Sequence, residues 1–303
     1  MLITTRTAML RQPLSPFAGR FFASSAPTVT VTKSEKKEEE KKREEEPPMA
    51  AVLQGPSLLY TSLHRPSPSL MMMPGLRSLP VWTSYDKNTQ ANRIAYQDPT
   101  VTKIVQHMQS KVDIIRNEYM SVSPNINSDY EDSDGALHTG TWDWHSYLLK
   151  GKIQPEFALN FPETTRILAE LQPYMFTGTP FGFCFFSKLA GQSKIQEHTS
   201  PINFRLRLHL PLVVPSNNTA ANIGIRVGPT ENIWRKDQAL VLDDSYRHEV
   251  WNHTDEERVL LLVDLWHPDV RMSEREEIVM MFQHAQQQGW LDGKDNNNNE
   301  DKQ

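Results

Sequence analysis

One stretch of this sequence, "HTSPINFRLRLHL" (198–210), alternates apolar and cationic side chains. Phe and Leu recur at every second position of its second half, which is the period of a β-strand with one apolar face. The opposite face carries Arg205, Arg207 and His209, where a solvent-facing strand would carry Thr, Ser, Lys and Glu. With His198 just upstream, these groups are suited to holding a small anion beside a metal ion. We therefore expect the polar face to line a cavity.

Two of the ten histidines, His198 and His248, lie at predicted strand edges, fifty residues apart. Non-haem iron oxygenases hold Fe(II) with two His and one carboxylate on one face, which leaves positions for co-substrate and O₂. In jelly-roll members the carboxylate comes two residues after the first His. Here that position holds Ser200, so the third-ligand position is predicted to be vacant. Two His at this spacing do not define a metal site by themselves.

Arg258 lies ten residues after His248 and begins the apolar run "RVLLLVDLW" (258–266). In 2-oxoglutarate oxygenases a basic residue at about this offset pairs with the far carboxylate of the co-substrate, because a guanidinium forks onto a carboxylate through two hydrogen bonds. The alternative is an Arg whose side chain reaches the surface from the end of an apolar strand.

The motifs of this chain resemble those of the catalytic domain of the aspartyl/asparaginyl β-hydroxylase family, which are Fe(II)- and 2-oxoglutarate-dependent dioxygenases. The resemblance covers nearly the whole predicted folded region in the same order. The matching segments are "GLRSLPVWT" (75–83), "FPETT" (161–165), "FSKL" (186–189), "HTSPINFRLRLHLPLVVP" (198–215), "DDSYRHEVWNHT" (243–254) and "RVLLLVDLWHP" (258–268).

The resemblance implies a metal site with two protein ligands, His198 and His248. Known hydroxylases of the family bind iron through two histidines only, and a small residue replaces the carboxylate. Ser200 stands at that position, so its presence does not argue against an enzyme. Asp243 and Asp244 are predicted to fix the turn before His248 rather than to bind metal. As an alternative, one of these carboxylates could orient the ring of that histidine through its second nitrogen.

The resemblance also implies contacts to 2-oxoglutarate. Ser187, eleven residues before His198, matches the serine that shares a co-substrate carboxylate with Arg258. Arg207 and His209 match residues beside the co-substrate. Arg205 lies on the same strand face, where it could meet an anionic substrate group or form a structural salt bridge. Both alternatives stay open.

The bulk composition excludes several classes. A net charge of −5 gives no reason to expect nucleic-acid binding. The single cysteine, Cys184, cannot form an internal disulfide and lies in the apolar run "FGFCFF", so a core thiol is predicted. No apolar run approaches the roughly 20 residues of a transmembrane segment.

The chain divides into four predicted segments. Residues 1–32 are rich in Arg and Ser and lack acids, as is typical of an organellar transit peptide; we expect a mitochondrial location, with plastid or cytoplasm as alternatives. Residues 33–74 form a charged, then Pro/Ser/Met-rich linker. Residues 75–291 are the dioxygenase-like domain, and 292–303 are a polar tail.

The domain is predicted to be mainly β, a double-stranded β-helix (jelly roll or cupin-like) buttressed by N- and C-terminal helices. Short apolar or alternating runs from 181 to 266 are separated by turn residues, which is typical of sandwiches and barrels. The segment 101–120 places apolar residues on one helical stripe. A last helix is predicted from Ser273, with Ser273 and Glu276 as its capping box.

The resulting hypothesis is an Fe(II)- and 2-oxoglutarate-dependent hydroxylase that uses O₂. Its substrate would be an Asp or Asn side chain in a peptide, an amino acid or other small molecule, or a lipid. One rival is a non-catalytic jelly-roll binding module that has lost iron chemistry. Another is a Zn²⁺ enzyme, which two His without a nearby Cys or carboxylate make a poor fit.

Overall fold

The computed structural model describes residues 71–89, 91–130 and 137–289. The predicted transit peptide and polar tail, and all but the end of the predicted linker, lie outside these ranges. In the part of the chain that is described, no helix has both the length and the apolar character needed to cross a bilayer.

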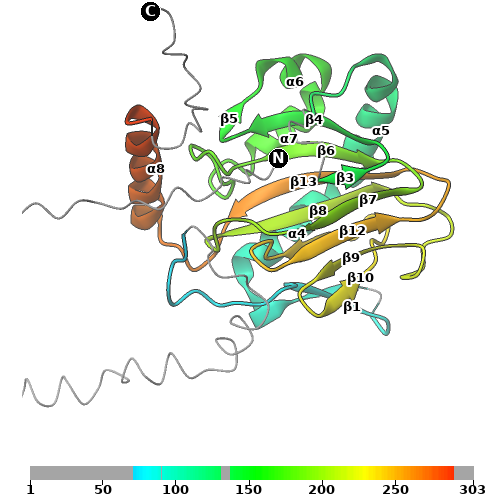
Figure 1. Ribbon diagram of the computed structural model, residues 1–303, viewed down its shortest axis with the longest axis horizontal. Coiled ribbons are helices and arrows are strands. Elements are labelled where there is room, and N and C mark those ends of the chain that lie inside the picture. Colours follow the sequence, from blue (N-terminus) through cyan, green and yellow to red (C-terminus); the bar gives the residue numbers. More distant parts are fainter. Residues whose placement is uncertain (1–70, 90, 131–136, 290–303) are drawn as a thin grey trace, which may run out of the picture. The chain divides into compact units, whose positions relative to one another are not determined.

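Two antiparallel sheets form the centre of the described fold (Figure 1). One has the strand order β11-β8-β13-β6-β4-β5 and the other β10-β9-β12-β7-β3. A separate hairpin joins β1 and β2. The strands are β1 Thr83–Asp86, β2 Ala91–Ile94, β3 His138–Thr139, β4 Trp142–Leu149, β5 Lys152–Ile153, β6 Cys184–Leu189, β7 Ser193–His198, β8 Arg205–Val213, β9 Ile223–Val227, β10 Thr230–Asn232, β11 Leu240–Leu242, β12 His248–Asn252 and β13 Arg258–Trp266.

The order of these strands is that of a jelly roll. Counted along the chain from β6 to β13, the first sheet pairs the sixth, third, eighth and first strands, and the second pairs the fifth, fourth, seventh and second. Successive strands therefore wind between two facing sheets, as in a double-stranded β-helix. The predicted fold class is confirmed. Strands β4 and β5 extend one sheet beyond β6, and β3 extends the other beyond β7.

The helices between residues 99 and 169 cover the outer face of the β8–β13–β6 sheet. The stripe predicted over 101–120 is buried as expected, but it is divided between two helices that meet at Lys111. The first of them begins where Asp98 accepts hydrogen bonds from the Thr100 and Val101 amides, with Pro99 at the first helical position. The helices are α4 Pro99–Ser110, α5 Val112–Val122, α6 Pro155–Asn160, α7 Pro162–Ala169 and α8 Met272–Gln287, with short 3₁₀ turns at Ala95–Gln97 and Ser123–Asn125.

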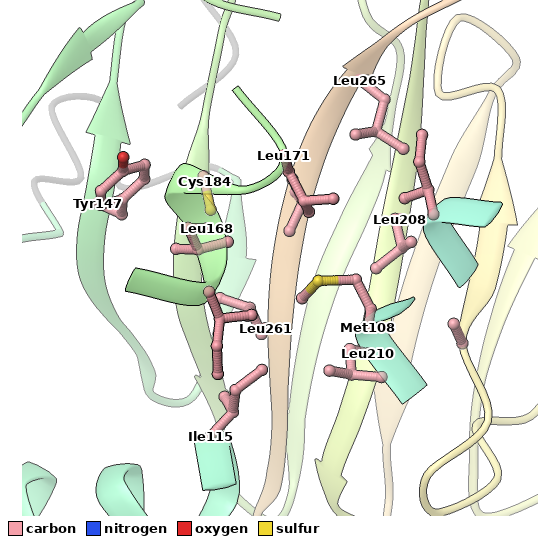
Figure 2. Packing of buried hydrophobic residues seen from close by; sticks show 14 of the residues in the cluster. Met108, Ile115, Tyr147, Leu168, Leu171, Cys184, Leu208, Leu210, Leu261 and Leu265 are labelled. Carbon is pink, nitrogen blue, oxygen red and sulfur yellow. The ribbon is translucent and has the colours of Figure 1, made fainter. Parts of the chain in front are cut away.

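The alternation of β8 is explained by this packing. Its leucines join one buried cluster with Met108 of α4 and Ile115 of α5, as Figure 2 shows for Leu208 and Leu210. Cys184 is fully buried in the same cluster, which confirms the predicted core thiol. A second cluster, with members from both sheets, fills the space between them. The cationic side chains of β8 therefore face the interior of the jelly roll.

Two boundaries differ from the sequence-based prediction. Residues 71–74, predicted as linker, belong to the described fold: the Met71 amide donates to the Pro201 carbonyl at 3.0 Å, and Asn203 exchanges two hydrogen bonds with Met73. The predicted capping box of the last helix is wrong. The helix starts earlier, with Arg271 as the N-cap, and Glu274 rather than Glu276 accepts from the Arg271 amide at 2.8 Å.

Candidate functional site

The two predicted metal ligands lie side by side. His198 is the last residue of β7 and His248 the first residue of β12, and these antiparallel strands pair the two residues directly. Their ring centroids are 4.1 Å apart, with the rings inclined by 56°. The strand order alone produces this meeting, because the second and seventh strands of a jelly roll are neighbours.

Backbone carbonyls set the orientation of both rings. Nδ1 of His198 lies 2.6 Å from the Gln196 carbonyl oxygen, and Nδ1 of His248 lies 2.9 Å from that of Tyr246. A carbonyl can only accept, so each Nδ1 carries the proton and each Nε2 keeps a free lone pair, which is the state that binds a metal. Burial lowers the pKa of both histidines, and this keeps them neutral. The predicted turn is confirmed for Asp243, whose Oδ1 accepts from the Ser245 amide at 3.0 Å. The alternative, an aspartate that orients the His248 ring, is wrong, because the Tyr246 carbonyl accepts from its Nδ1.

No carboxylate joins the histidine pair. Within the described ranges, no group of three His, Cys, Asp or Glu side chains is arranged to hold a metal ion. Ser200 is fully buried, and its Oγ accepts a hydrogen bond from Arg205 Nη2 at 3.2 Å. The side chains therefore fit a metal held by two imidazoles with its remaining positions open, as the resemblance implied.

Arg205 is held inside a buried ion cluster. Its guanidinium contacts both Asp244 and Asp264, donates to the Phe181 carbonyl and also reaches Ser200. All three guanidinium nitrogens therefore have protein partners, and the residue is only 1% exposed. Of the two alternatives left open by the sequence, the structure shows the salt bridge.

Arg207 belongs to the same cluster. Its Nε and Nη2 donate to the two oxygens of Asp264 at 2.7 and 3.0 Å, and Nη1 lies 3.3 Å from Asp244. Burial disfavours the charge on Arg207, but the two aspartates outweigh burial and raise its pKa. Burial likewise opposes the charge on Asp244, but Arg205 and Arg207 hold the pKa of that carboxyl well below its usual range. Arg205, Arg207, Asp244 and Asp264 form what we call the ion cluster.

Arg258 lacks the aspartate partners that the described structure gives to Arg205 and Arg207. It is 2% exposed, no carboxylate of the described residues lies within ion-pair distance, and its Nε has no hydrogen-bond partner among them. Burial lowers its pKa to about 9. Its Nη2 donates to Ser187 Oγ at 3.2 Å, and its guanidinium lies over the Trp234 ring, 4.8 Å from the centroid. A buried cation of this kind is costly unless an anion joins it.

Ser187 is prepared to donate to that anion. Its Oγ accepts from Arg258 and also from the Trp142 indole N–H at 2.9 Å. With both lone pairs used, the hydroxyl proton remains for an acceptor such as a carboxylate. We call Ser187, His209 and Arg258 the anion clamp.

His209 completes the clamp from β8. It is 5% exposed, and its Nδ1 accepts from the Trp234 indole N–H at 3.3 Å. Its Nε2 is buried without a hydrogen-bond partner among the described residues. Burial first, then the charges of Arg207, Arg258 and His248, lower its pKa well below the usual range, so the ring is neutral.

The sequence prediction did not include Trp142 and Trp234, although both touch the clamp. Trp142 lies on β4, and Trp234 lies between β10 and β11. A buried Trp usually finds a partner for its indole N–H, but nothing local to "GTWDW" or "NIWRK" shows that the partner is a clamp residue. Only the strand pairing of β4 with β6 brings Trp142 to Ser187.

Fold and site together define a jelly-roll protein whose interior holds two neighbouring imidazoles and a buried guanidinium that no carboxylate of the described ranges balances. A family model described as Aspartyl/Asparaginyl beta-hydroxylase matches residues 109–268. The chain belongs to this family, and the predicted family assignment is confirmed.

Individual relatives match over part of their length. The human Aspartyl/asparaginyl beta-hydroxylase is 26% identical over 211 residues, which are 69% of this chain but only 26% of the human protein. The Ornithine lipid ester-linked acyl 2-hydroxylase of Rhizobium tropici is 43% identical over 83 residues, 27% of this chain and 29% of that protein. A solved 2OG-Fe(II) oxygenase-family oxidoreductase from Burkholderia pseudomallei superposes with a TM-score of 0.33 at 14% identity, covering 50% of this chain and 78% of that one.

Proposed function

We propose that this protein is an Fe(II)- and 2-oxoglutarate-dependent dioxygenase that hydroxylates a C–H bond. The observation that carries the proposal is Arg258, a buried guanidinium with no carboxylate partner in the described part of the chain, and the Ser187 hydroxyl beside it. A dianionic co-substrate would supply the missing charge. The family and the names of the relatives support the same activity.

The residues have separate roles in this reaction. Nε2 of His198 and of His248 would hold Fe(II), because both Nδ1 atoms are committed to carbonyls. Arg258 and the Ser187 hydroxyl would bind the far carboxylate of 2-oxoglutarate. When bound, Fe(II) supplies the redox chemistry by which O₂ and 2-oxoglutarate yield succinate, CO₂ and one hydroxyl group on the substrate. The jelly-roll interior excludes bulk water from the reacting groups.

The substrate is proposed more broadly. One relative is named for aspartyl and asparaginyl residues and another for the acyl chain of an ornithine lipid. We propose either a peptide or amino-acid side chain or a lipid acyl chain. Because the Arg205 guanidinium is already paired with Asp244 and Asp264, an acidic substrate group would have to meet a different residue. Stimulation of 2-oxoglutarate turnover by Asp- and Asn-containing peptides, compared with lipid extracts, separates the two classes.

The activity is tested by succinate formation from 2-oxoglutarate, with the full chain, Fe(II) and ascorbate. His198→Ala and His248→Ala run beside the unchanged protein. We expect slow turnover without substrate, abolished in both variants. If the full chain shows neither turnover nor Fe(II)-dependent binding of 2-oxoglutarate, the enzyme is excluded and a jelly-roll binding module remains.

For the location of the protein we propose import into mitochondria, with plastid and cytoplasm as the other outcomes. The support is the Arg-rich, acid-free composition of residues 1–32. Microscopy of the full chain with a C-terminal fluorescent tag, beside a chain that lacks 1–32, tests it. Co-localisation with a mitochondrial marker is expected only for the full chain.

A further inference from the structure

The strongest unexplained feature near the clamp is a pair of buried nitrogens on two residues that both contact Trp234. Nε2 of His209 and Nε of Arg258 are both buried and lack a hydrogen-bond partner among the described residues. Buried polar groups are nearly always satisfied, so two of them together point to an absent acceptor. Trp234 contacts both residues and is fully buried.

Trp234 determines which nitrogen of His209 is protonated. The indole nitrogen can only donate, so His209 Nδ1 must accept at 3.3 Å and must carry no proton. The neutral ring then has its single proton on Nε2, the atom for which the described residues supply no partner. His198 and His248 have the opposite arrangement, because carbonyls place the proton on their Nδ1 atoms. His198 and His248 therefore offer an Nε2 lone pair, whereas His209 offers an Nε2–H group.

Trp234 also limits the freedom of Arg258. The guanidinium lies 4.8 Å from the indole centroid, so the ring occupies one face of the cation and attracts it. Ser187 receives one of its N–H groups, and Nε remains for a ligand. One side chain therefore orients both the neutral and the cationic donor of the anion clamp.

We propose that Trp234 is a positioning residue for co-substrate binding, which keeps His209 as an Nε2–H donor and holds the Arg258 guanidinium toward the same carboxylate-bearing ligand. This inference rests on the proposed function for the identity of the ligand. The orientation of His209 does not depend on it.

The test compares two Trp→Phe variants, which lose the same side-chain volume at different places in the fold. Trp234→Phe removes the indole N–H at the clamp, whereas Trp82→Phe removes the same atoms from another fully buried tryptophan, whose Nε1 has no partner among the described residues. Trp82 belongs to the cluster outside the sheets, so it controls for the loss of packing. The thermal midpoints of the two variants show whether both still fold.

Two measurements are made on the full chain. Nitrogen NMR of ¹⁵N-histidine-labelled, metal-free protein reports the tautomer of His209, with the signal assigned by its loss in His209→Gln. We expect Nε2–H in the unchanged protein and in Trp82→Phe, and a mixture of tautomers in Trp234→Phe. Calorimetry with Fe(II) in the absence of oxygen measures the dissociation constant of 2-oxoglutarate. We expect this constant to rise about tenfold in Trp234→Phe only, because the loss of one buried hydrogen bond weakens binding by about this factor.

The possible negative results of these measurements lead to different conclusions. The inference is overturned if the unchanged protein carries the His209 proton on Nδ1, or if Trp234→Phe binds 2-oxoglutarate as well as Trp82→Phe does. If the unchanged protein does not bind 2-oxoglutarate at all, the proposed function fails, while the NMR result still decides whether Trp234 sets the tautomer.

Discussion

Arg205 and Arg258 lie in the same barrel and are equally buried, yet their surroundings are opposite. Arg205 has two aspartates within ion-pair distance and a hydrogen-bond partner for each of its three guanidinium nitrogens. Arg258 has no carboxylate among the described residues and keeps an unpartnered Nε. Removing one partner of a buried ion pair destabilises the fold, whereas a buried cation with a strongly lowered pKa and no charged partner is a candidate for ligand binding. The comparison separates the ion cluster from the anion clamp.

The largest effect is expected in the ion cluster. Asp264→Asn leaves Arg205 and Arg207 short of one buried negative charge, since Asp264 contacts both. Removing one partner of a buried ion pair costs about 3–5 kcal/mol of unfolding free energy. Denaturant unfolding measures the loss. Asp113→Asn, in an exposed pair with Arg116, is the control and should change little. A loss no larger than that of the control would show that the cluster is not a stabilising unit.

A substitution in the anion clamp should not destabilise the protein as one in the ion cluster does. Arg258→Met removes a buried cation that no carboxylate balances, so the unfolding free energy should stay unchanged or rise. Binding of 2-oxoglutarate should weaken by about 100-fold or more, because its charged partner is lost. Calorimetry tests the expected loss of binding, and denaturant unfolding of the same samples tests the expected stability. Stability that falls as far as in Asp264→Asn would remove the distinction between the two regions.

Ser187→Ala should have an intermediate effect on binding. The change removes the hydroxyl that lies between Arg258 and Trp142 and leaves the cation in place. We expect the dissociation constant of 2-oxoglutarate to rise about tenfold, as for one lost hydrogen bond. Ser146→Ala, on the neighbouring strand β4, is a matched control outside the clamp. Equal binding by the two variants would exclude Ser187 from the clamp.

A last effect, caused by pH and not by a substitution, is expected in mild acid. Burial lowers the pKa of His198, His209 and His248, so the unfolded chain takes up protons near pH 6.5 before the folded chain does. Because the unfolded state binds more protons, stability is complete above about pH 6.5 and falls below it. The pKa of Asp244 is also lowered, but its contribution is lost only below about pH 4.

Unfolding of the metal-free full chain at about pH 7.5 and at about pH 5.5 measures this difference. We expect lower stability at the acid pH and a smaller decrease in His209→Gln. A stability that is the same at both pH values would mean that the three histidines are not held neutral.

Local patterns allowed much of the fold to be predicted. The period of β8, the apolar runs of β9 and β13 and the stripe of α4 and α5 all occur as expected, because an element's burial pattern repeats along its own sequence. Strand β7 was not predicted: its outward positions carry Lys194 and Glu197, and only the position of His198 was placed at a strand edge. Its partners β3 and β12 make it a strand.

The sequence by itself determined the fold class, the family and the two histidines that meet across β7 and β12. Only the tertiary structure decided which of the buried arginines are paired with aspartates. Asp264 lies opposite Arg207 through the β8–β13 register, and Asp244 reaches Arg205 from a turn 39 residues away. It also placed two tryptophans against the clamp. The physical reason is that periodicity depends on neighbours in the chain, whereas the charge state and tautomer of a buried group depend on partners that only folding brings within a few ångströms.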